Sequence, residues 1–381
     1  MKKIPYGRQT IDEEDIRGVI ETLSSDYITQ GPIVEEFENK VSRYCNSEFS
    51  IAFNSATSAL HAACYALNLK KGDWLWTSPI SFVSSANCGI FCGAKVDFVD
   101  IDIDTYNLCP IKLEEKLISA KKNNTLPKIV IPVHMAGQSC DMKKIHELSR
   151  QYGFKVIEDA SHAIGGEYKE NKIGNCKYSD ITVFSFHPVK IITTGEGGIA
   201  LTNNESLNRK LKLHRSHGIV RSETNNDEGW LYEQIELGYN YRMNDIEASL
   251  GISQLKKLDR FVQIRNQLAE RYNKLINSKM VTKPQISEDC LSSFHLYIVR
   301  INKNVDRKAV FNFLRNAGIE VNVHYIPIHT QPYYKNTGVK FANLTNAESY
   351  YESAITLPIF PSLTQSDQDY VVDTLMESID L

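Results

Sequence analysis

The sequence predicts an α/β fold in which a large domain with a mostly parallel sheet precedes a smaller C-terminal α+β domain. The 381 residues are enough for a full core and a second domain. Short apolar runs alternate with helical patterns between residues 50 and 202, as in parallel strands covered by helices on both faces. After residue 244 the pattern changes. We therefore expect a large domain over residues 1–250, and a linking helix and small domain over residues 251–381.

The predicted strands of the large domain are short and apolar. They are Ser50 to Phe53, Trp74 to Ser78, Val96 to Asp100, Lys128 to His134, Lys155 to Asp159, Ile181 to Phe186 and Ile199 to Thr202. Open α/β sheets bind ligands at the carboxyl ends of their strands. Polar residues that directly follow these strands are therefore candidates for a site.

The C-terminal part begins with a helical pattern. Apolar residues at three- and four-residue steps predict one long helix from Asn244 through Leu275, with a stripe that packs in the core or in a dimer interface. Ser293 to Ile301 and Gly318 to Tyr325 are predicted strands, and Arg307 to Asn316 is the helix between them. The polar stretch from Val220 to Gly229 predicts a mobile loop that reaches over the site of a neighbouring subunit.

The composition excludes several function classes. A net charge of −3 and a pI near 6.4 argue against nucleic acid as a partner and favour small molecules or proteins. The eight cysteines include no Cys-x-x-Cys pair, so we expect reduced thiols and no metal site. The start lacks the apolar stretch of a signal peptide, and no apolar run has membrane-spanning length. We expect a cytoplasmic protein without a membrane partner.

A lysine follows the predicted strand Ile181 to Phe186. The segment Phe184 to Gly198 has the sequence FSFHPVKIITTGEGG, and Lys190 is its one lysine. Hydrophobic surroundings would depress the pKa of this amine and free it to attack a carbonyl, as in a Schiff-base lysine. A solvated loop lysine is equally compatible with the local pattern. His187 and Glu196 have mainly turn-shaping roles in either case.

A carboxylate ends the predicted strand Lys155 to Asp159. In this position Asp159 is placed to hold the pyridinium proton of pyridoxal phosphate, and that proton makes the ring an electron sink. An aspartate after a strand is also a common helix cap. The local sequence leaves both interpretations open.

Two segments near the amino end are suited to an aromatic phosphate ester. Asn54 to Ala63 opens an alanine-rich helix after a strand, where free N–H groups and the helix dipole favour an anion, with Ser55 or Thr57 adding hydroxyls. Simple helix capping also explains this pattern. In the turn from Ser78 to Asn87, Phe82 is placed either to stack on a flat ring or to pack in the core.

In chain order, the small-residue helix start, the aromatic turn, the strand that ends in Asp159 and the segment of Lys190 resemble the DegT-type sugar-nucleotide aminotransferases, which are pyridoxal-phosphate enzymes of aminotransferase fold type I. The resemblance covers essentially the whole chain. It implies that Lys190 forms the Schiff base with pyridoxal 5'-phosphate and moves the proton, while Asp159 faces the pyridine nitrogen. It also implies a homodimer whose neighbouring subunit completes the phosphate site. The further cofactor-binding residues that it implies are Ala56, Thr57, Phe82, His162, Ser185 and Asn240, the last from the neighbouring subunit. Many members of the family have glutamine at the position of His162.

Three further segments resemble one branch of the family. Ile4 to Gln9, Leu23 to Pro32 and Tyr325 to His329 are similar to the transaminases that form UDP-4-amino-4,6-dideoxy-N-acetyl-β-L-altrosamine for pseudaminic acid synthesis. The similarity implies a UDP-linked 4-keto-6-deoxy-N-acetylhexosamine of L-arabino configuration as acceptor, aminated at C4, and L-glutamate as donor. The implied substrate-binding residues are Tyr6, Asp26, Tyr27, Ile28, Thr29, Tyr325, Ile326, Pro327, Ile328 and His329.

Three alternatives remain open from the sequence. The enzyme could aminate a different 4-keto or 3-keto nucleotide sugar, because the cofactor motifs do not separate these substrates. A pyridoxal-phosphate sugar dehydratase has the same fold, but in the family it replaces the lysine by histidine, and Lys190 argues against it. A non-catalytic protein that binds a nucleotide sugar is disfavoured by the joint presence of Lys190, Asp159 and Ser185.

Overall fold

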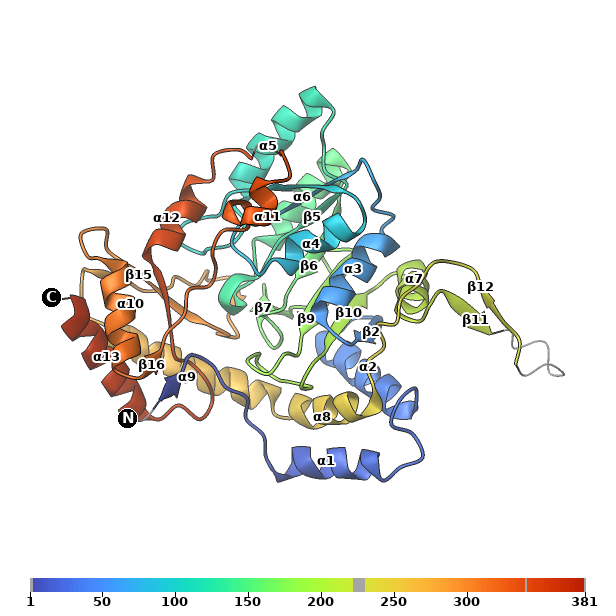
Figure 1. Cartoon of the computed structure of the whole chain (residues 1–381), viewed down its shortest axis with the longest axis horizontal. Coiled ribbons are helices and arrows are strands. Elements are labelled where there is room, and N and C mark those ends of the chain that lie inside the picture. The colour runs from blue at the N-terminus through green and yellow to red at the C-terminus, as the bar shows by residue number, and fades with distance from the viewer. Residues whose placement is uncertain (1–2, 222–229, 340, 380–381) are drawn as a thin grey trace.

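A seven-stranded sheet forms the centre of this computed structural model, which describes residues 3–221, 230–339 and 341–379 (Figure 1). The strand order is β2-β10-β9-β6-β5-β3-β4. Strands β9, β6, β5, β3 and β4 are parallel, and β10 is antiparallel to both of its neighbours. The mostly parallel sheet is thus confirmed. The strands are β2 (Phe49–Phe53), β3 (Trp74–Thr77), β4 (Lys95–Phe98), β5 (Ile129–Ile131), β6 (Lys155–Asp159), β9 (Ile181–Ser185) and β10 (Gly198–Thr202).

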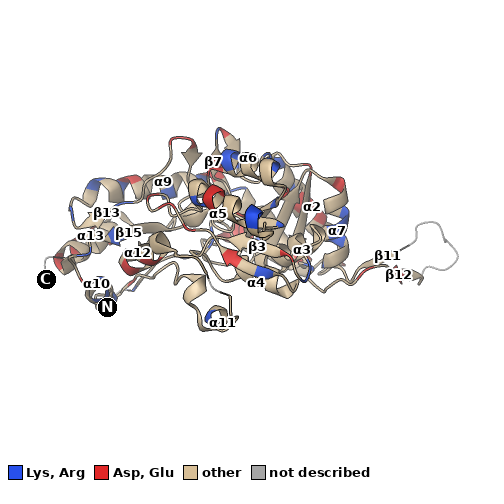
Figure 2. Cartoon of the chain, turned by 90° about the horizontal axis from the view of Figure 1, so that it is seen from above, with Lys and Arg blue, Asp and Glu red and all other residues tan. Residues whose placement is uncertain are grey.

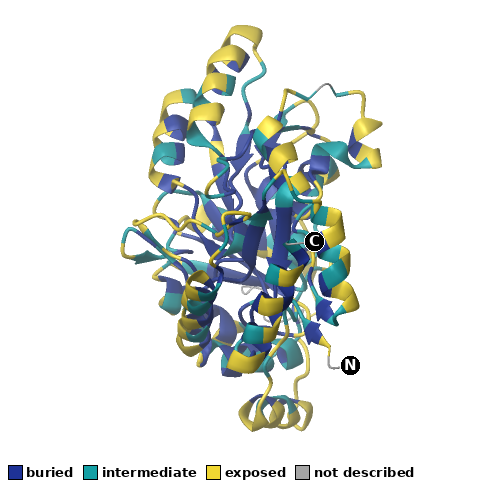
Figure 3. Ribbon diagram, turned by 90° about the vertical axis from the view of Figure 1, so that its left-hand side faces the viewer, coloured by how far each residue is buried: buried dark blue, intermediate teal, exposed yellow. Residues whose placement is uncertain are grey.

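Helices cover both faces of this sheet, which explains the near-continuous apolar character of its strands. Figure 3 shows the buried strands in the middle and the exposed faces of the helices outside. Five of these helices begin with a capping side chain or a proline, and α4 is the exception. These helices are α2 (Pro32–Cys45), α3 (Ala56–Ala66), α4 (Ser84–Phe91), α5 (Pro110–Asn123), α6 (Met142–Tyr152) and α7 (Glu205–Arg215).

The predicted single helix after Asn244 is wrong in one respect, because the structure has two helices there. Helix α8 (Asp245–Leu255) ends before Lys256, and α9 (Leu258–Leu275) begins after Lys257. The break coincides with a buried ion pair: Lys257 Nζ contacts Asp15 Oδ2 at 2.7 Å, which ties the break to the amino-terminal helix α1 (Glu13–Leu23). Such a contact between distant segments leaves no signal in the local apolar spacing.

A second core lies in the C-terminal part. Strands β13 (Val281–Thr282), β15 (Tyr297–Ile301) and β17 (Ala354–Leu357) form an antiparallel sheet. Helices α10 (Arg307–Asn316) and α13 (Gln365–Ile379) supply buried side chains to the same core. The helix over Arg307 to Asn316 is confirmed, and this mixed architecture fits the small α+β domain that we propose for residues 251–381.

Two predicted strands of this part are shorter than expected. The first begins only at Tyr297, and the second is reduced to β16 (Ile319–Glu320). Strand β16 pairs in parallel with β1 (Ile4–Pro5), which joins the amino-terminal segment to the C-terminal part. This pairing depends on residues more than 300 positions apart, and it places Tyr6 beside the segment that follows β16. The remaining short elements are β7 (Glu167–Tyr168), β8 (Asn171–Lys172), β14 (Cys290–Leu291), η1 (Met135–Gly137), η2 (Ile328–Thr330), α11 (Pro332–Lys335) and α12 (Thr345–Ser353).

A two-stranded arm extends from the body of the molecule. It consists of β11 (Ile219–Arg221) and β12 (Tyr232–Gln234), and residues 222–229 of the predicted loop lie outside the described residues (Figures 1 and 2). Figure 2 shows that basic and acidic residues are interspersed along the helices. In the part of the chain that the structure describes, no helix is both long and apolar enough to span a bilayer.

Candidate active site

A cavity of about 470 Å³ lies where the carboxyl ends of β6 and β9 meet the start of α3. The turn before α4 and the C-terminal segment 322–325 close it from other sides. This arrangement follows the rule that open α/β sheets bind ligands at strand ends. Nine of the residues predicted for the site line the cavity, namely Tyr6, Ala56, Thr57, Phe82, Asp159, His162, Ser185, Lys190 and Tyr325.

Lys190 lies in the turn between β9 and β10 and is half-buried against the cavity. Its backbone N–H donates to the carbonyl of His187 at 2.9 Å, which closes the turn. Gly197 is required in this turn, because a Cβ there would lie 2.2 Å from Thr194 Oγ1. Burial lowers the pKa of Lys190 to about 8, although the Asp159 carboxylate acts in the opposite direction. A larger fraction of this amine is therefore free at neutral pH than in a solvated loop lysine.

Asp159 is the last residue of β6 and is only 5% exposed. The Ser85 hydroxyl donates to its Oδ2 at 2.6 Å, and the Ser161 N–H donates to Oδ1 at 3.2 Å. No helix begins after β6 at this point, which excludes the helix-cap interpretation. These two donors fix the carboxylate where it can hold a proton on a pyridine nitrogen.

The neighbouring carboxylate, Glu158, faces away from the cavity. It accepts hydrogen bonds from His134 at 2.7 Å, Ser179 at 2.5 Å and Thr182 at 2.9 Å. Burial opposes ionisation, but these donors outweigh it and lower the pKa of Glu158 below its usual value. His134 Nδ1 accepts a hydrogen bond from the backbone N–H of Cys140, so Nε2 bears a proton and donates a hydrogen bond to Glu158. Glu158 thus anchors β6, while Asp159 on the same strand serves the cavity.

The start of α3 forms a cradle for an anion. Ser55 caps the helix by accepting the N–H of Ser58 at 3.1 Å, which leaves the first-turn N–H groups of Ala56 and Thr57 for a ligand. Ser185 borders the same space from the end of β9. Gly198 permits the close approach of β10, because a Cβ there would lie 2.4 Å from the nitrogen of Ala56. These donors fit the phosphate of the implied cofactor.

Phe82 is 60% exposed although it lines the cavity. Its ring lies 6.4 Å from that of Tyr325, at an angle of 59°. An ordinary core phenylalanine would be buried, so the core-packing interpretation does not hold. The exposed ring instead provides an apolar surface on which a flat ligand can stack.

Three neutral histidines lie beside Lys190. His162 Nε2 is 3.1 Å from Tyr325 Oη, and its buried Nδ1 has no hydrogen-bond partner among the described residues. Its ring lies 4.4 Å from that of His295. Burial lowers the pKa of His162 well below its usual value and that of His324 to about 3, and the charge of Lys190 acts in the same direction. The unpartnered nitrogen of His162 fits a ligand that brings a hydroxyl to this point, as the implied cofactor does.

Nine other predicted residues do not line the cavity of a single chain. Residues 26–29 lie in an exposed loop, and Asn240 is exposed as well. Ile328 is fully buried in the core, and its N–H donates to the carbonyl of Pro79. His329 pairs with Glu348 at 3.1 Å. The roles of Asp26, Tyr27, Ile28, Thr29, Asn240, Ile326, Pro327, Ile328 and His329 remain predictions.

Several residues of the site were missed from sequence. Ser85 holds Asp159, and Ser81 and Ser84 flank Phe82 in the same turn. Asn322 and His324 enter from the C-terminal part, together with Tyr325. The serine-rich composition of the turn and the position of His324 next to Tyr325 were the available signals, but neither identifies a contact partner.

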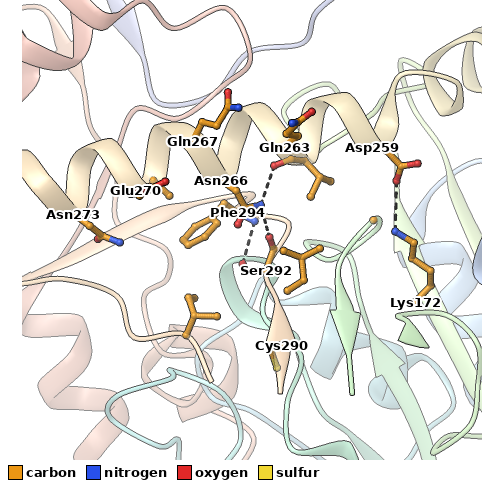
Figure 4. A pocket seen from close by; sticks show the side chains of 15 residues that line it. Lys172, Asp259, Gln263, Asn266, Gln267, Glu270, Asn273, Cys290, Ser292 and Phe294 are labelled. Atoms are coloured by element: carbon orange, nitrogen blue, oxygen red, sulfur yellow. Dashed lines mark hydrogen bonds and ion pairs between the residues drawn. The ribbon is translucent and has the colours of Figure 1, made fainter. Parts of the chain in front are cut away.

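A second cavity, of about 610 Å³, lies between α9 and β14 (Figure 4). Amide and carboxylate side chains of α9 line it, among them Gln263, Gln267 and Glu270. Its one lysine, Lys172, forms ion pairs with Glu167 and Asp259. It offers neither a free amine nor an anion cradle, so the smaller cavity is the candidate active site.

Residues 9–376 match the model of the DegT/DnrJ/EryC1/StrS aminotransferase family. The chain belongs to this family. It is 38% identical over 380 residues to a UDP-4-amino-4,6-dideoxy-N-acetyl-beta-L-altrosamine transaminase of Campylobacter jejuni, covering 99% of this chain and 98% of that one. Helicobacter pylori PseC, an aminotransferase involved in the biosynthesis of pseudoaminic acid, has a TM-score of 0.91 at 31% identity, with 100% of both chains covered.

The PLP-form of Spr1654 from Streptococcus pneumoniae has a TM-score of 0.90 at 30% identity, covering 100% of this chain and 99% of that chain. The present protein has pyridoxal phosphate as its cofactor and adopts aminotransferase fold type I. The residues that line the cavity fit the groups of this cofactor: an anion cradle, an exposed aromatic ring, a buried carboxylate and a lysine with a depressed pKa.

Proposed function

We propose that this aminotransferase transfers the amino group of L-glutamate to C4 of a UDP-linked 4-keto-6-deoxy-N-acetylhexosamine of L-arabino configuration. The product is UDP-4-amino-4,6-dideoxy-N-acetyl-β-L-altrosamine, a precursor for pseudaminic acid. The main support for transamination is that Lys190 and Asp159 line one cavity at the strand ends. The Campylobacter jejuni and Helicobacter pylori relatives support the sugar and its pathway.

When bound, pyridoxal phosphate supplies an aldehyde that takes up amino groups and a protonated ring that accepts the electron pair released at the substrate carbon. Asp159 would hold the proton on the ring nitrogen, because two hydrogen-bond donors fix its carboxylate in place. The hydroxyls of Thr57 and Ser185 and the N–H groups of α3 bind the phosphate. Phe82 would cover one face of the ring, and the unpartnered Nδ1 of His162 would accept a hydrogen bond from the ring hydroxyl.

Lys190 performs the proton transfer. Its amine, with a pKa of about 8, takes a proton from the α-carbon of the donor in the first half of the reaction. In the second half it returns a proton to C4 of the sugar. The neutral histidines beside it are poor alternatives, because burial keeps their pKa values far below 7. His324 and His162 therefore shape and polarise the cavity around Lys190.

The substrate side is formed by segments from both ends of the chain. Tyr6 follows β1 and Tyr325 follows β16. Because the two strands pair, both phenols lie at the cavity. Burial raises the pKa of both, so they act as neutral hydroxyl donors to a sugar. A different 4-keto or 3-keto nucleotide sugar is the second candidate, since the cofactor half of the site is indifferent to the acceptor.

A shared site in a homodimer is part of this proposal. Lys190 is the sole lysine or arginine among the described residues that line the cavity, yet the cofactor phosphate, the donor and the sugar diphosphate are all anionic. Further donors must therefore come from outside the single chain. The exposed Asn240, near the base of the β11–β12 arm, is the proposed contribution of the second subunit to the phosphate.

Mixed dimers test the shared site. Lys190→Ala and Asn240→Asp subunits are each expected to give inactive or weak homodimers. Random mixing makes about half of the dimers mixed, and each mixed dimer has one intact site of two. The mixture should therefore have about a quarter of the wild-type activity. Mixtures that stay at the level of the parents would contradict the shared site.

The substrate is tested by incubating the holoenzyme with L-glutamate and individual UDP-4-ketosugars, followed by NMR of the product. The expected result is amination of the L-arabino ketosugar with the amine in the altro configuration at C4. Selective amination of a D-configured 4-ketosugar or of a 3-ketosugar would overturn the proposed substrate while leaving the reaction class intact.

A further inference from the structure

One short turn contacts three separate parts of the active site. Residues 81–85 connect the loop after β3 to the first residues of α4. Phe82 lines the cavity and is exposed, whereas Ser84 and Ser85 are 8% and 0% exposed. The hydroxyls of these two serines form hydrogen bonds to different elements, one to α3 and the other to β6.

Ser85 fixes the carboxylate of Asp159. Its Oγ lies 2.6 Å from Asp159 Oδ2 and 2.6 Å from Ser81 Oγ. A hydroxyl has one proton, and Ser85 donates it to Asp159, so Ser81 donates to Ser85. Since Ser161 N–H contacts the other oxygen, the plane of the carboxylate is held from two sides.

Ser84 fixes the hydroxyl of Thr57. The two Oγ atoms are 2.7 Å apart, and this is the hydrogen bond that the described residues offer to Thr57 Oγ1. When Ser84 donates, the proton of Thr57 is free to point into the cavity. The half-buried Thr57 lies in the first turn of α3, in the anion cradle.

We propose that Ser84 and Ser85 are positioning residues for two different groups of the cofactor. Ser85 directs Asp159 to the ring nitrogen, and Ser84 directs Thr57 to the phosphate. The inference rests on the roles proposed above for Asp159 and Thr57. Because Phe82 lies in the same turn, a single segment aligns the ring face, the ring nitrogen and the phosphate.

Binding of cofactor analogues to the full-length protein tests this inference without reference to turnover. The three probes are pyridoxal phosphate, its 1-deaza analogue, in which a C–H replaces the ring nitrogen, and pyridoxal, which lacks the phosphate. Removing a hydrogen bond that supports a charged contact should weaken binding about tenfold. Ser85→Ala should show this loss with pyridoxal phosphate but not with the deaza analogue. Ser84→Ala should show it with pyridoxal phosphate but not with pyridoxal.

Two further variants separate positioning from packing. Ser85→Thr retains the hydroxyl and should bind all three probes as the wild type does. Ser149→Ala removes a buried hydroxyl that donates to His146 O at 2.7 Å on the distant helix α6, and it should change none of the affinities. Where Ser85→Ala does not fold, Ser85→Cys has similar shape and a weaker donor, and carries the same prediction.

The results also separate this inference from the proposed function. If Asp159→Asn loses affinity for pyridoxal phosphate but not for the deaza analogue, the role of Asp159 holds. An equal loss of both probes in Ser85→Ala would then overturn the positioning role of Ser85 alone. If Asp159→Asn itself does not discriminate between the probes, the assignment of Asp159 fails and the inference about Ser85 fails with it. A loss of pyridoxal affinity in Ser84→Ala equal to its loss of pyridoxal phosphate affinity would overturn the role of Ser84.

Discussion

The two halves of the active site differ in how completely one chain builds them. In the half formed by the sheet, Asp159 has two donors and Ser55 caps the anion cradle. In the half formed by the segments around Tyr6 and Tyr325, residues 26–29, which are predicted to bind the substrate, are exposed and do not line the cavity. The contrast fits the proposal that the cofactor chemistry is built into the sheet, whereas the choice of substrate depends on the segments around Tyr6 and Tyr325 and on a second subunit.

The largest effect is expected for the lysine of the sheet half. Lys190→Ala should fold and bind pyridoxal phosphate without a covalent bond, but lose turnover by at least about 10³-fold, because the group that moves the proton is missing. Steady-state kinetics with L-glutamate measure this loss. Lys172→Ala, which removes the ion-paired lysine of the second cavity, is the matched control and should keep near-wild-type rates. Full activity in Lys190→Ala would refute the mechanism.

The two carboxylates of β6 should give opposite phenotypes. Asp159→Asn removes the charge that holds the ring proton and should slow the half-reaction with L-glutamate roughly 10²-fold or more, with little loss of stability. Glu158→Gln replaces an acceptor of three hydrogen bonds and should lower the free energy of unfolding by about 1–3 kcal/mol, with a smaller effect on rate. Urea unfolding and single-turnover kinetics measure both quantities. Similar phenotypes for the two variants would show that β6 does not separate anchoring from chemistry.

The pH dependence of cofactor attachment sharpens the role of burial at Lys190. The rate at which apoprotein and pyridoxal phosphate form the covalent bond should rise about tenfold per pH unit and level off near pH 8, because only the free amine reacts. Asp159 raises the pKa of Lys190, so the plateau in Asp159→Asn should begin at a lower pH. Stopped-flow absorption measures both profiles. A wild-type rate that still rises between pH 9 and pH 10 would contradict the depressed pKa.

The smallest effect is expected for the exposed ring of Phe82. Because its side chain is largely in solvent, Phe82→Ala should change protein stability by less than about 0.5 kcal/mol. Loss of the stacking surface should nevertheless weaken pyridoxal phosphate binding by about 2- to 10-fold. Thermal unfolding of the apoprotein and a cofactor titration provide the two numbers. A large stability loss without a change in affinity would indicate core packing.

The sequence predicted the elements whose character is local. Strand β6 and helix α10 have the predicted bounds, because a buried apolar run and an amphipathic repeat are visible within a few residues. The break between α8 and α9 was missed, since Leu255 and Leu258 continue the apolar spacing across it. The parallel pair β1–β16 was missed because neither two-residue strand has a pattern of its own.

The same distinction applies to the site. Lys190 and Asp159 were predicted because Asp159 ends strand β6 and Lys190 lies in the turn that follows β9, where the strand ends converge. The contact of Ser85 with Asp159 joins residues 74 positions apart, and His324 reaches the cavity through the packing of the C-terminal part. Such contacts depend on tertiary packing. The contact of Asp26 to Thr29 with a substrate remains a prediction, because these residues lie in an exposed loop of the single chain.

Chemical trapping of the cofactor tests directly whether Lys190 binds it covalently and whether L-glutamate releases it. The holoenzyme is reduced with sodium borohydride, digested and mapped by mass spectrometry, with and without prior exposure to L-glutamate. The account predicts a pyridoxyl adduct on the peptide that contains Lys190, and its loss when L-glutamate has first converted the cofactor to the amine form. An adduct on another lysine, or an adduct on Lys190 that L-glutamate does not diminish, would contradict the proposed transamination at this site.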